Sequence, residues 1–435
     1  MTTTDADYYR LRTEWLRFKS QLHDNLTGLP ALPAVVDLVR RAVEARGAVD
    51  LVYIDLGRSG WHESKLGWSA YDEGVREFAG VLALLRSEGL IGPDDVACLH
   101  TVRSDRFLVF LAAGAEVKGS SSAQARDRLL RATRQRMAGA ASSRLLRSLR
   151  LSAGHARIAD DPMVRAERAI QQAVTDAMLM TLNERETVEA ARREDLHRLI
   201  DEAAVRSVFH PIVRLRDGQA VGHEALTRPT RATAFDSVED LFAFAESTEL
   251  LVEFERLCRN TAIRAASGLG AGLLFLNASP SAVEDPEWGN GEVERRLRES
   301  GLGPGDIVVE ITERVAVGRS EAFQAALRTF KQRGYRVAVD DMGAGYASLQ
   351  TLAAIEPDFL KFDTSLVRDI DRSSIKRSLL ESLRSLAEKI DARVIADGVE
   401  RPEERQTLIE LGIELGQGFH FHRETPVPLP AREQS

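Results

Sequence analysis

Eight short β candidates alternate with amphipathic helical segments over the last part of the chain, and this alternation limits the fold more than any other feature. Segments such as 323–334 and 374–390 have apolar residues at the spacing of an amphipathic helix. Eight β/α repeats over roughly 240 residues match the usual size of a (β/α)₈ barrel, about 250 residues. The sequence therefore predicts a TIM barrel with strands at 207–213, 221–228, 272–279, 306–313, 336–342, 358–363, 392–398 and 417–421.

The first two β candidates are joined only by the segment RLRDGQA. This segment is too short for a crossover helix, so the two strands cannot be parallel neighbours. We expect an antiparallel hairpin, which makes the predicted barrel a modified one with one antiparallel strand.

The chain has 435 residues, too many for a single ordinary domain. Before the barrel, helical patterns near 31–46 and 70–89 alternate with β-rich runs at 50–56, 106–113 and 149–158, which predicts an α/β domain with a mostly antiparallel sheet. The charged segment 162–203 has no glycine and its only proline at the start, so we expect a stiff helix there. The predicted organisation is an N-terminal amphipathic helix at 1–22, an α/β domain at 23–185, a helical connector at 186–197 and a barrel domain at 198–430.

Charge and cysteine content exclude several classes of protein. The formal net charge is −8 and the pI is about 5.7, which gives no general basis for binding DNA or RNA. Cys98 and Cys258 are too few for a disulfide framework or a thiolate metal site. The N-terminus has no apolar signal segment, and runs such as FAGVLALL fall far short of the ~20 residues that cross a bilayer. We expect a cytoplasmic protein without membrane insertion.

Polar residues recur where the predicted barrel strands end, the place where barrel enzymes carry their chemistry. A single acidic residue there is more often a helix cap or a salt-bridge partner, but recurrence on seven consecutive strands favours a site. The set comprises Glu224, Asn277, Glu310, Asp340, Asp341, Lys361, Asp397 and Gln417.

Carboxylates with one amide, and without cysteine, form an oxygen-rich donor set that suits Mg²⁺ or Mn²⁺. Five carboxylates exceed what one octahedral ion needs, so we expect two ions that activate a water and stabilise an in-line displacement at phosphorus. Lys361 would add positive charge where the transition state becomes negative. The inferred reaction is metal-assisted phosphodiester hydrolysis.

The adjacent pair Asp340 and Asp341 raises a geometric difficulty, because neighbours on a regular strand point to opposite faces. Both can serve one site only if the strand bends there. Gly343 and Gly345 follow directly and would permit such a bend.

The motifs EALTR, LNAS, EITE, DDMGAGYASL, LKFD, ADGVE and QGF, in this order, resemble those of the EAL-domain family. That resemblance covers 194–425. It implies a cyclic-di-GMP phosphodiesterase that opens its substrate to linear pGpG with two Mg²⁺ or Mn²⁺ ions.

The resemblance also implies roles for single residues. Lys361 would position the attacking water and act with Glu224, Asp340 and Asp397 in catalysis. Substrate contacts would come from His210, Arg228 and Gln417, and loop bracing from Glu313 and Glu400. The implied metal ligands are Glu224, Asn277, Glu310, Asp340, Asp341 and Asp397.

Three positions depart from the family pattern: His210 replaces glutamine, Met342 replaces phenylalanine and Asp397 replaces glutamate. Methionine is an apolar side chain of similar reach, and histidine still has hydrogen-bonding nitrogens. Asp397 is the most serious change, because it withdraws the carboxylate by over ~1 Å while metal–oxygen distances tolerate only ~0.2 Å. We expect a weakly held second metal.

The first domain resembles a degenerate GGDEF domain. DNLTGLPALPAVVDLV is similar to the family's entry segment, GWSAYD to its GHxxGD segment, and Asp55 to its first metal aspartate. The signature itself is replaced by Arg103 to Phe107, which places a cation, Arg106, at the position of the catalytic glutamate. Diguanylate cyclase activity is not expected, and two roles stay open: a folded scaffold, or a sensor that binds GTP and regulates the barrel.

Two functions follow for the whole chain. The first is hydrolysis of cyclic-di-GMP, and the alternative is a weak or inactive receptor that binds cyclic-di-GMP and acts through a protein partner. The resemblance also implies a homodimer, with the loop carrying Met342 near the interface and the N-terminal helix as a second contact.

Overall fold

The protein is described by a computed structural model that covers residues 12, 15, 22–56, 68–112, 121–140, 151–267, 272–283, 285–312, 321–343, 352 and 355–422. The chain divides into two compact units, Met1–Ala191 and Arg192–Ser435. Among the helices of the described part, none is long and apolar enough to cross a membrane. Most of the predicted N-terminal helix and the loop after Gly343 lie outside the described residues.

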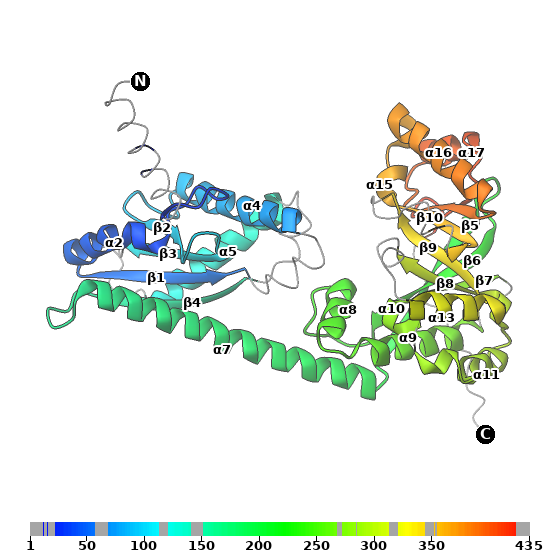
Figure 1. Ribbon diagram of the computed structural model, residues 1–435, viewed down its shortest axis with the longest axis horizontal. Helices are drawn as coiled ribbons and strands as arrows, with labels where there is room; N and C mark the ends of the chain where they lie inside the picture. Colours follow the sequence, from blue (N-terminus) through cyan, green and yellow to red (C-terminus); the bar gives the residue numbers. More distant parts are fainter. Residues whose placement is uncertain are drawn as a thin grey trace. The chain divides into compact units, whose positions relative to one another are not determined.

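The N-terminal unit contains a four-stranded antiparallel sheet, which confirms the predicted α/β fold (Figure 1). The strands are β1 (Ala48–Asp55), β2 (Val96–Leu99), β3 (Arg106–Ala112) and β4 (Ser152–Ala159), in the order β2-β3-β1-β4. Side chains of β1 alternate between the two faces of the sheet, as a strand requires. Val52 and Ile54 pack with α4 (Trp68–Ser87) and α5 (Ser122–Ala140), whereas Leu51 and Tyr53 pack with α2 (Leu32–Arg46) and α7 (Ala166–Asp201).

Two of these elements were not expected from the sequence. Strand β2 has four residues, too few to show a period of two. Helix α5 lies in the arginine-rich stretch 118–148, where few apolar residues mark a buried stripe. Pairing with β3 and burial against the sheet, rather than local pattern, define these two elements.

Helix α7 is a single continuous helix, as the absence of glycine predicted. Its first turns belong to the N-terminal unit, where Ile170 and Val174 are buried. Its last turns belong to the C-terminal unit, where Leu196 and Leu199 pack with Leu241 and Phe254. The division between the units therefore falls within one helix.

The C-terminal unit is a closed eight-stranded barrel, which confirms the predicted fold. The strand order is β10-β11-β12-β5-β6-β7-β8-β9, and β5 pairs antiparallel with both of its neighbours. The predicted hairpin is therefore the β5–β6 pair. The strands are β5 (Val205–Arg214), β6 (Ala220–Pro229), β7 (Leu273–Asn277), β8 (Ile307–Thr312), β9 (Arg336–Met342), β10 (Phe359–Phe362), β11 (Arg393–Ala396) and β12 (Leu415–Gly416).

Helices of the C-terminal unit lie between the strands along the chain. Their apolar sides and the outward sides of the strands form one large core, in which Phe323 and Phe330 pack with Ile307 and Val309. The helical segments are α8 (Val238–Ser247), α9 (Leu251–Ala266), α10 (Pro280–Val283), η1 (Pro286–Trp288), α11 (Glu292–Glu299), η2 (Pro304–Asp306), α13 (Glu321–Gln332), α15 (Thr364–Val367), η3 (Ile370–Arg372), α16 (Ser374–Lys389) and α17 (Pro402–Glu410).

The barrel interior is filled by apolar side chains rather than open. One cluster takes a buried residue from seven of the eight strands, as expected for stacked inward layers. Its members are Ile212, Phe275, Val308, Ala338, Phe359, Ile395 and Leu415.

The prediction for the eighth strand was wrong in position. The strand is β12, Leu415–Gly416, and Gln417 follows its end instead of starting it. Two residues cannot show a strand period, whereas the phenylalanines at 419 and 421 alternate with other residues and favoured a strand at 417–421. Pairing with β11 and β5 fixes the strand in the folded protein.

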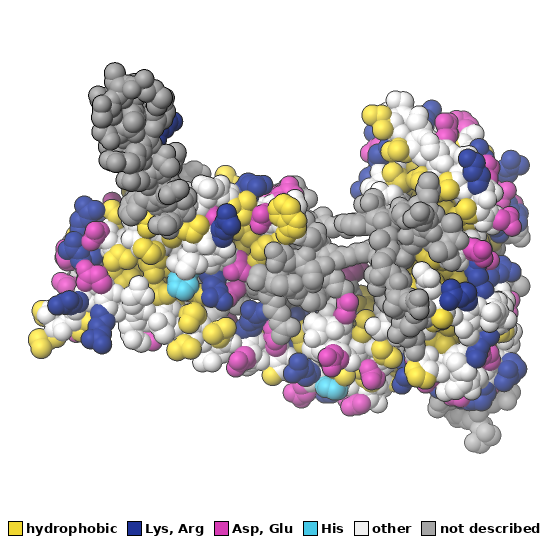
Figure 2. Space-filling view, in the orientation of Figure 1, with side chains coloured by type: hydrophobic (Ala, Val, Ile, Leu, Met, Phe, Trp, Pro, Cys, Tyr) yellow, Lys and Arg dark blue, Asp and Glu magenta, His cyan; other side chains and the backbone are white. Residues whose placement is uncertain are grey.

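Charges on the molecular surface are mixed. On the face drawn in Figure 2, basic and acidic side chains are interspersed over both units. This distribution accords with a chain of modest net negative charge, and the described residues on that face form no extended basic area of the kind that binds nucleic acid.

Candidate active site

The ammonium group of Lys361 lies at the centre of the predicted site. Its Nζ is 3.0 Å from Glu224 Oε2, 3.0 Å from Glu310 Oε1 and 3.6 Å from Asp340 Oδ2. The Lys361 side chain is only 1% exposed. Four residues predicted from the sequence, on four different strands, therefore meet at one point.

Strand register explains why these residues meet. Asn277 at the end of β7 pairs with Glu310 on β8, and Thr312 of β8 pairs with Asp340 on β9. In a parallel barrel the carboxyl ends of the strands lie at the same rim, so side chains from these positions converge.

Glu224 is held by three donors. Its Oε1 accepts a hydrogen bond from Asn277 Nδ2 at 3.0 Å, and its Oε2 accepts from Gln417 Nε2 at 2.8 Å and from Lys361 at 3.0 Å. Burial alone would raise the pKa of Glu224, but Lys361 and the two amide donors outweigh it and lower the pKa to about 2. Glu224 is therefore ionised at neutral pH.

Glu310 is in a different environment, although it belongs to the same cluster. It is 1% exposed, and apart from the Lys361 ammonium, 3.0 Å from its Oε1, no donor among the described residues bonds to its carboxylate oxygens. Burial raises the pKa of Glu310 well above its usual range, and the ion pair with Lys361 only partly opposes this shift. A buried carboxylate with so few partners is the kind of group that a bound cation would satisfy.

The charge on Lys361 is maintained by its neighbours. Burial alone would lower the pKa of Lys361, but Glu224, Glu310, Asp340 and Asp397 together raise it well above its usual value. Lys361 therefore stays protonated and supplies positive charge rather than acting as a base.

Asp397 lies directly after β11 and faces the same cluster. Its backbone N–H donates to Phe362 O at 3.0 Å, and its Oδ1 accepts from the N–H of Gly398 at 2.7 Å. Burial raises the pKa of Asp397 to about 6, and Lys361 opposes this shift. Asp397 is thus positioned to contribute charge to the site.

Strand β9 bends at the adjacent aspartates, as a shared site would require. The register between β9 and β10 shifts between Leu360 and Phe362. Asp341 has a φ of 58°, in the left-handed region, so the departure from regular strand geometry begins at Asp341 itself. Asp340 faces Lys361, while Asp341 is exposed at the rim.

A short hydrogen-bonded chain joins two of the predicted substrate residues, His210 and Gln417, to Glu224. His210 on β5 is opposite Glu224 on β6, and Gln417 Nε2 lies 2.8 Å from His210 Nδ1 while it donates to Glu224. The ring of the exposed Phe419 lies 6.0 Å from that of His210. Arg228 is four residues after Glu224 on β6, hence on the same side of the strand, and donates to Thr227 O at 2.8 Å.

The two predicted loop-bracing residues have different outcomes. Glu400 accepts a hydrogen bond from Arg368 Nη2 at 2.6 Å, and its backbone N–H donates to Glu404. These contacts tie the segment after β11 to the end of α15. Glu313 lies outside the described residues.

The donor set fits hard divalent cations. Oxygen ligands are what Mg²⁺ and Mn²⁺ prefer, and a bound cation would give the buried Glu310 carboxylate a partner in addition to Lys361. Four carboxyl groups surround the single ammonium of Lys361, more than it can neutralise if all of them are ionised.

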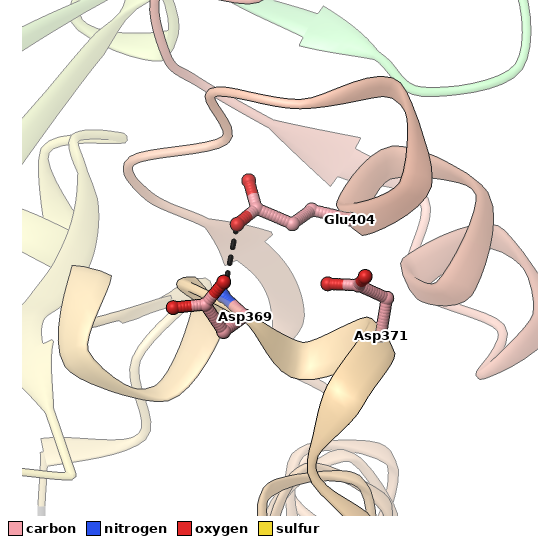
Figure 3. Close-up of side chains that lie close together, drawn as sticks. All are labelled: Asp369, Asp371 and Glu404. Atoms are coloured by element: carbon pink, nitrogen blue, oxygen red, sulfur yellow. Dashed lines mark hydrogen bonds between the residues drawn. The ribbon is translucent and has the colours of Figure 1, made fainter.

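A second acidic cluster in the barrel unit has a structural explanation. Asp369, Asp371 and Glu404 lie close together, from the η3 segment and α17 (Figure 3). Arg401 pairs with Asp369 and Asp371, and Glu404 accepts hydrogen bonds from the backbone N–H groups of Asp369, Glu400 and Arg401. These contacts already satisfy the carboxylates, so this cluster is not a candidate metal site.

Sequence reasoning missed one buried acidic residue near the site. Glu255 on α9 is 8% exposed and contacts Ser279, two residues after Asn277. The available signal was a charge in an apolar row of the helix, between Leu251 and Ala262, where a solvated glutamate is not expected.

A comparison with protein families matches residues 193–424 to the EAL domain. The chain belongs to the EAL-domain family. The match covers more than half of the chain and includes every described strand of the barrel. The residues around Lys361 are therefore the strand-end residues of an EAL domain.

Two relatives are similar in sequence to this chain. An uncharacterized protein of Mycobacterium tuberculosis, Rv1354c, is 28% identical over 428 residues, which are 93% of this chain and 66% of the relative. The cyclic di-GMP phosphodiesterase NbdA of Pseudomonas aeruginosa is 28% identical over 256 residues, 58% of this chain and 32% of that protein. This chain thus spans less than two thirds of either relative.

Among solved structures, a standalone EAL protein of Vibrio cholerae O395 in its c-di-GMP bound form is 27% identical. The alignment covers 52% of this chain and 94% of that one, with a TM-score of 0.45.

Proposed function

We propose that this protein hydrolyses cyclic-di-GMP to linear pGpG. The observation that carries the proposal is the Lys361 ammonium among Glu224, Glu310 and Asp340 at the barrel rim of an EAL domain. NbdA, a relative over this part of the chain, is named as a cyclic di-GMP phosphodiesterase.

The residues that would hold two Mg²⁺ or Mn²⁺ ions are Glu224, Asn277, Glu310, Asp340, Asp341 and Asp397. Bound there, such ions supply a water of lowered pKa and neutralise charge on the phosphodiester. Amide donors hold the Glu224 carboxylate, whereas no amide donor reaches the Glu310 carboxylate. This contrast supports a site in which Glu310 binds a cation.

The protein's own residues have distinct tasks in this proposal. Lys361 holds a positive charge beside the position of the attacking water and of the developing negative charge. Gln417 and Asn277 hold the Glu224 carboxylate in one orientation. His210, Arg228 and Gln417 line the rim and would contact the guanine bases and phosphates.

The aspartate at 397 favours reduced rather than absent activity. It keeps a carboxylate in the cluster and is close enough to shift the pKa of Lys361. One methylene fewer than glutamate withdraws its oxygens by over ~1 Å, which weakens direct coordination.

Incubation of the full chain with cyclic-di-GMP and Mg²⁺ or Mn²⁺ tests the proposal by resolving the nucleotides. We expect pGpG as the product. If no pGpG forms across a range of metal concentration and pH, hydrolysis is excluded. Calorimetry then decides for the alternative: binding of cyclic-di-GMP without turnover identifies a receptor that acts through protein partners.

We further propose that the N-terminal unit is a GGDEF-like domain without cyclase activity. Arg106, at the position of the family's catalytic glutamate, lies 3.8 Å from Asp55, the counterpart of the first metal aspartate. A cation there opposes metal binding at Asp55. Incubation with GTP and Mg²⁺ should yield no cyclic-di-GMP, while GTP binding with a change in phosphodiesterase rate would identify a sensor rather than a scaffold.

A further inference from the structure

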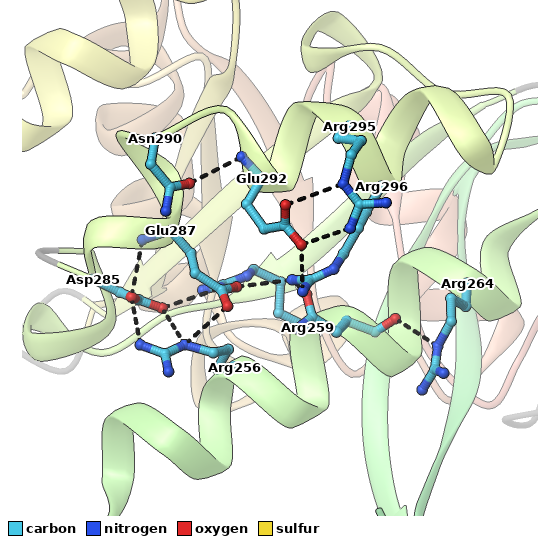
Figure 4. Close-up of polar contacts among 10 residues, drawn as sticks. Arg256, Arg259, Arg264, Asp285, Glu287, Asn290, Glu292, Arg295 and Arg296 are labelled. Carbon is cyan, nitrogen blue, oxygen red and sulfur yellow. Dashed lines mark hydrogen bonds and ion pairs between the residues drawn. The ribbon is translucent and has the colours of Figure 1, made fainter.

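Helix α9 organises the chain that leaves the catalytic strand β7. This connection runs from Asn277 through α10 and η1 to α11, and several of its polar contacts go to α9 (Figure 4). Arg256 and Arg259 pair with Asp285 and Glu287, and Asn260 accepts a hydrogen bond from Arg296. The polar residues of one helix thus fix the path of the loop from its far end.

Glu255 fixes the near end of the same loop. The N–H of Ser279 lies 3.2 and 3.3 Å from the two carboxylate oxygens of Glu255, and Ser279 Oγ donates to Oε2 at 2.8 Å. The backbone carbonyl of Ser279 accepts from Val283 and so begins α10. Glu255 therefore sets the point at which the strand turns into the following helix.

This contact lies two residues beyond Asn277. On the other side of the chain, the N–H of Ala278 donates to Glu310 O at 2.9 Å. Residues 278 and 279 are thus held by β8 and by α9, and Asn277 is left with its amide nitrogen directed to Glu224. This orientation leaves the Asn277 carbonyl oxygen as the atom available to a cation.

Burial of the Glu255 carboxyl group has a free-energy cost that a residue serving only to fill space would not have. It is 8% exposed, and burial raises its pKa to about 7, although the Ser279 hydrogen bonds oppose the shift. The nearby Arg259 is already engaged by Asp285 and Glu287 at 3.0 and 2.7 Å. An apolar side chain of similar volume would fill the space without this desolvation cost.

We propose that Glu255 is a positioning residue for the metal centre: by holding Ser279 it fixes the main chain at Asn277 and thereby orients the Asn277 amide as a ligand. The inference rests on the proposed function only in taking Asn277 as a metal ligand. It assigns a role to a helix residue that does not itself reach the metal centre.

The test measures Mn²⁺ binding to the full chain without nucleotide, by the loss of the free Mn²⁺ signal in electron paramagnetic resonance. Glu255→Gln keeps the shape but loses an acceptor, and we expect Mn²⁺ affinity to fall about tenfold, as for other residues that orient ligands. Glu253→Gln, an exposed residue on the same helix, is the matched control and should bind Mn²⁺ like the wild type.

A second readout separates positioning from structural support. Because Glu255→Gln removes a buried charge, the melting temperature of the metal-free variant should equal or exceed that of the wild type while its Mn²⁺ affinity falls. A parallel fall of both would overturn the inference, as would unchanged Mn²⁺ affinity in Glu255→Gln.

Ser279→Ala gives independent support, because it removes one donor and leaves the helix intact. We expect it to weaken Mn²⁺ binding less than Glu255→Gln does, and the double variant to bind no more weakly than Glu255→Gln alone. Additive losses would overturn the inference. Failure of the proposed function would look different: normal Mn²⁺ binding with the expected variant pattern, but no pGpG from cyclic-di-GMP.

Discussion

Glu310 and Glu404 are equally buried, each 1% exposed, yet their environments are opposite. Glu404 accepts hydrogen bonds from three backbone N–H groups, which outweigh the effect of burial and lower its pKa. Among the described residues Glu310 has only the Lys361 ammonium as a donor, and burial raises its pKa well above the usual range.

This difference separates an acidic cluster that stabilises the fold from one prepared for a ligand. The proximity of carboxylates is greatest in the cluster of Asp369, Asp371 and Glu404, but Arg401 and main-chain donors already satisfy it. Around Lys361 the carboxylates exceed the positive charge that the protein supplies. The candidate metal site is therefore identified by carboxylate oxygens that have few donors, and not by how close together the carboxylates lie.

The largest effect is expected from a substitution within the cluster around Lys361. Glu310→Gln should lower the rate of cyclic-di-GMP hydrolysis by at least about 100-fold, because it removes a metal ligand and the charge that attracts the cation. Mn²⁺ should raise the melting temperature of the wild type but not of this variant. Turnover within tenfold of the wild type would show that Glu310 is not a ligand.

The matching change in the other cluster should affect stability instead. Glu404→Ala leaves three backbone N–H groups without their acceptor, and we expect a loss of about 3 kcal/mol in the free energy of unfolding, measured by urea denaturation. Mn²⁺ affinity of the folded variant should not change. Loss of Mn²⁺ binding with unchanged stability would reverse the assignment of the two clusters.

Glu255 is a third buried glutamate, and its contribution to stability is expected to depend on pH. Its pKa is raised by burial from 4.5 to about 7, so the folded protein holds this proton more tightly than the unfolded chain does. The contribution of Glu255 to stability is therefore most favourable below pH 4.5 and falls by about 3 kcal/mol as the pH rises through 7. Among charged neighbours, Arg259 lowers this pKa and Glu246 raises it.

Urea denaturation of metal-free wild type and Glu255→Gln between pH 5 and 8 measures this contribution by difference. The variant should gain stability relative to the wild type as the pH rises. A difference that is constant with pH would place the pKa of Glu255 near its ordinary value.

The smallest expected effect concerns Asp397. Asp397→Glu should raise turnover about threefold to tenfold at limiting Mg²⁺, because the longer side chain brings its oxygens closer to the metals. The comparison of initial rates at several Mg²⁺ concentrations checks this expectation. Unchanged or lower turnover would reject the short carboxylate as a limit on activity.

Much of the barrel and of its site could be predicted from the sequence, for definite physical reasons. Apolar runs ending in a polar residue mark strands whose ends meet at one rim, and this pattern predicts that Glu224, Glu310, Asp340 and Lys361 lie together, as they do. The short segment between β5 and β6 determined their antiparallel pairing in the same way.

Other features depended on contacts between distant segments. The two-residue strand β12 and the hydrogen bond between Gln417 and His210 have no local sequence pattern that predicts them. Glu255 and Ser279 are 24 residues apart, and only the packing of α9 beside β7 brings them together.

The sequence alone determined the residue types available for chemistry, the number of β strands in the barrel and the ends of most of them, because these depend on local periodicity and order along the chain. Only the tertiary structure decided which carboxylates are satisfied and which are left in need of a cation. That distinction depends on donors such as Arg401, Asn277 and the main-chain N–H groups around Glu404, whose positions arise when strands and helices pack.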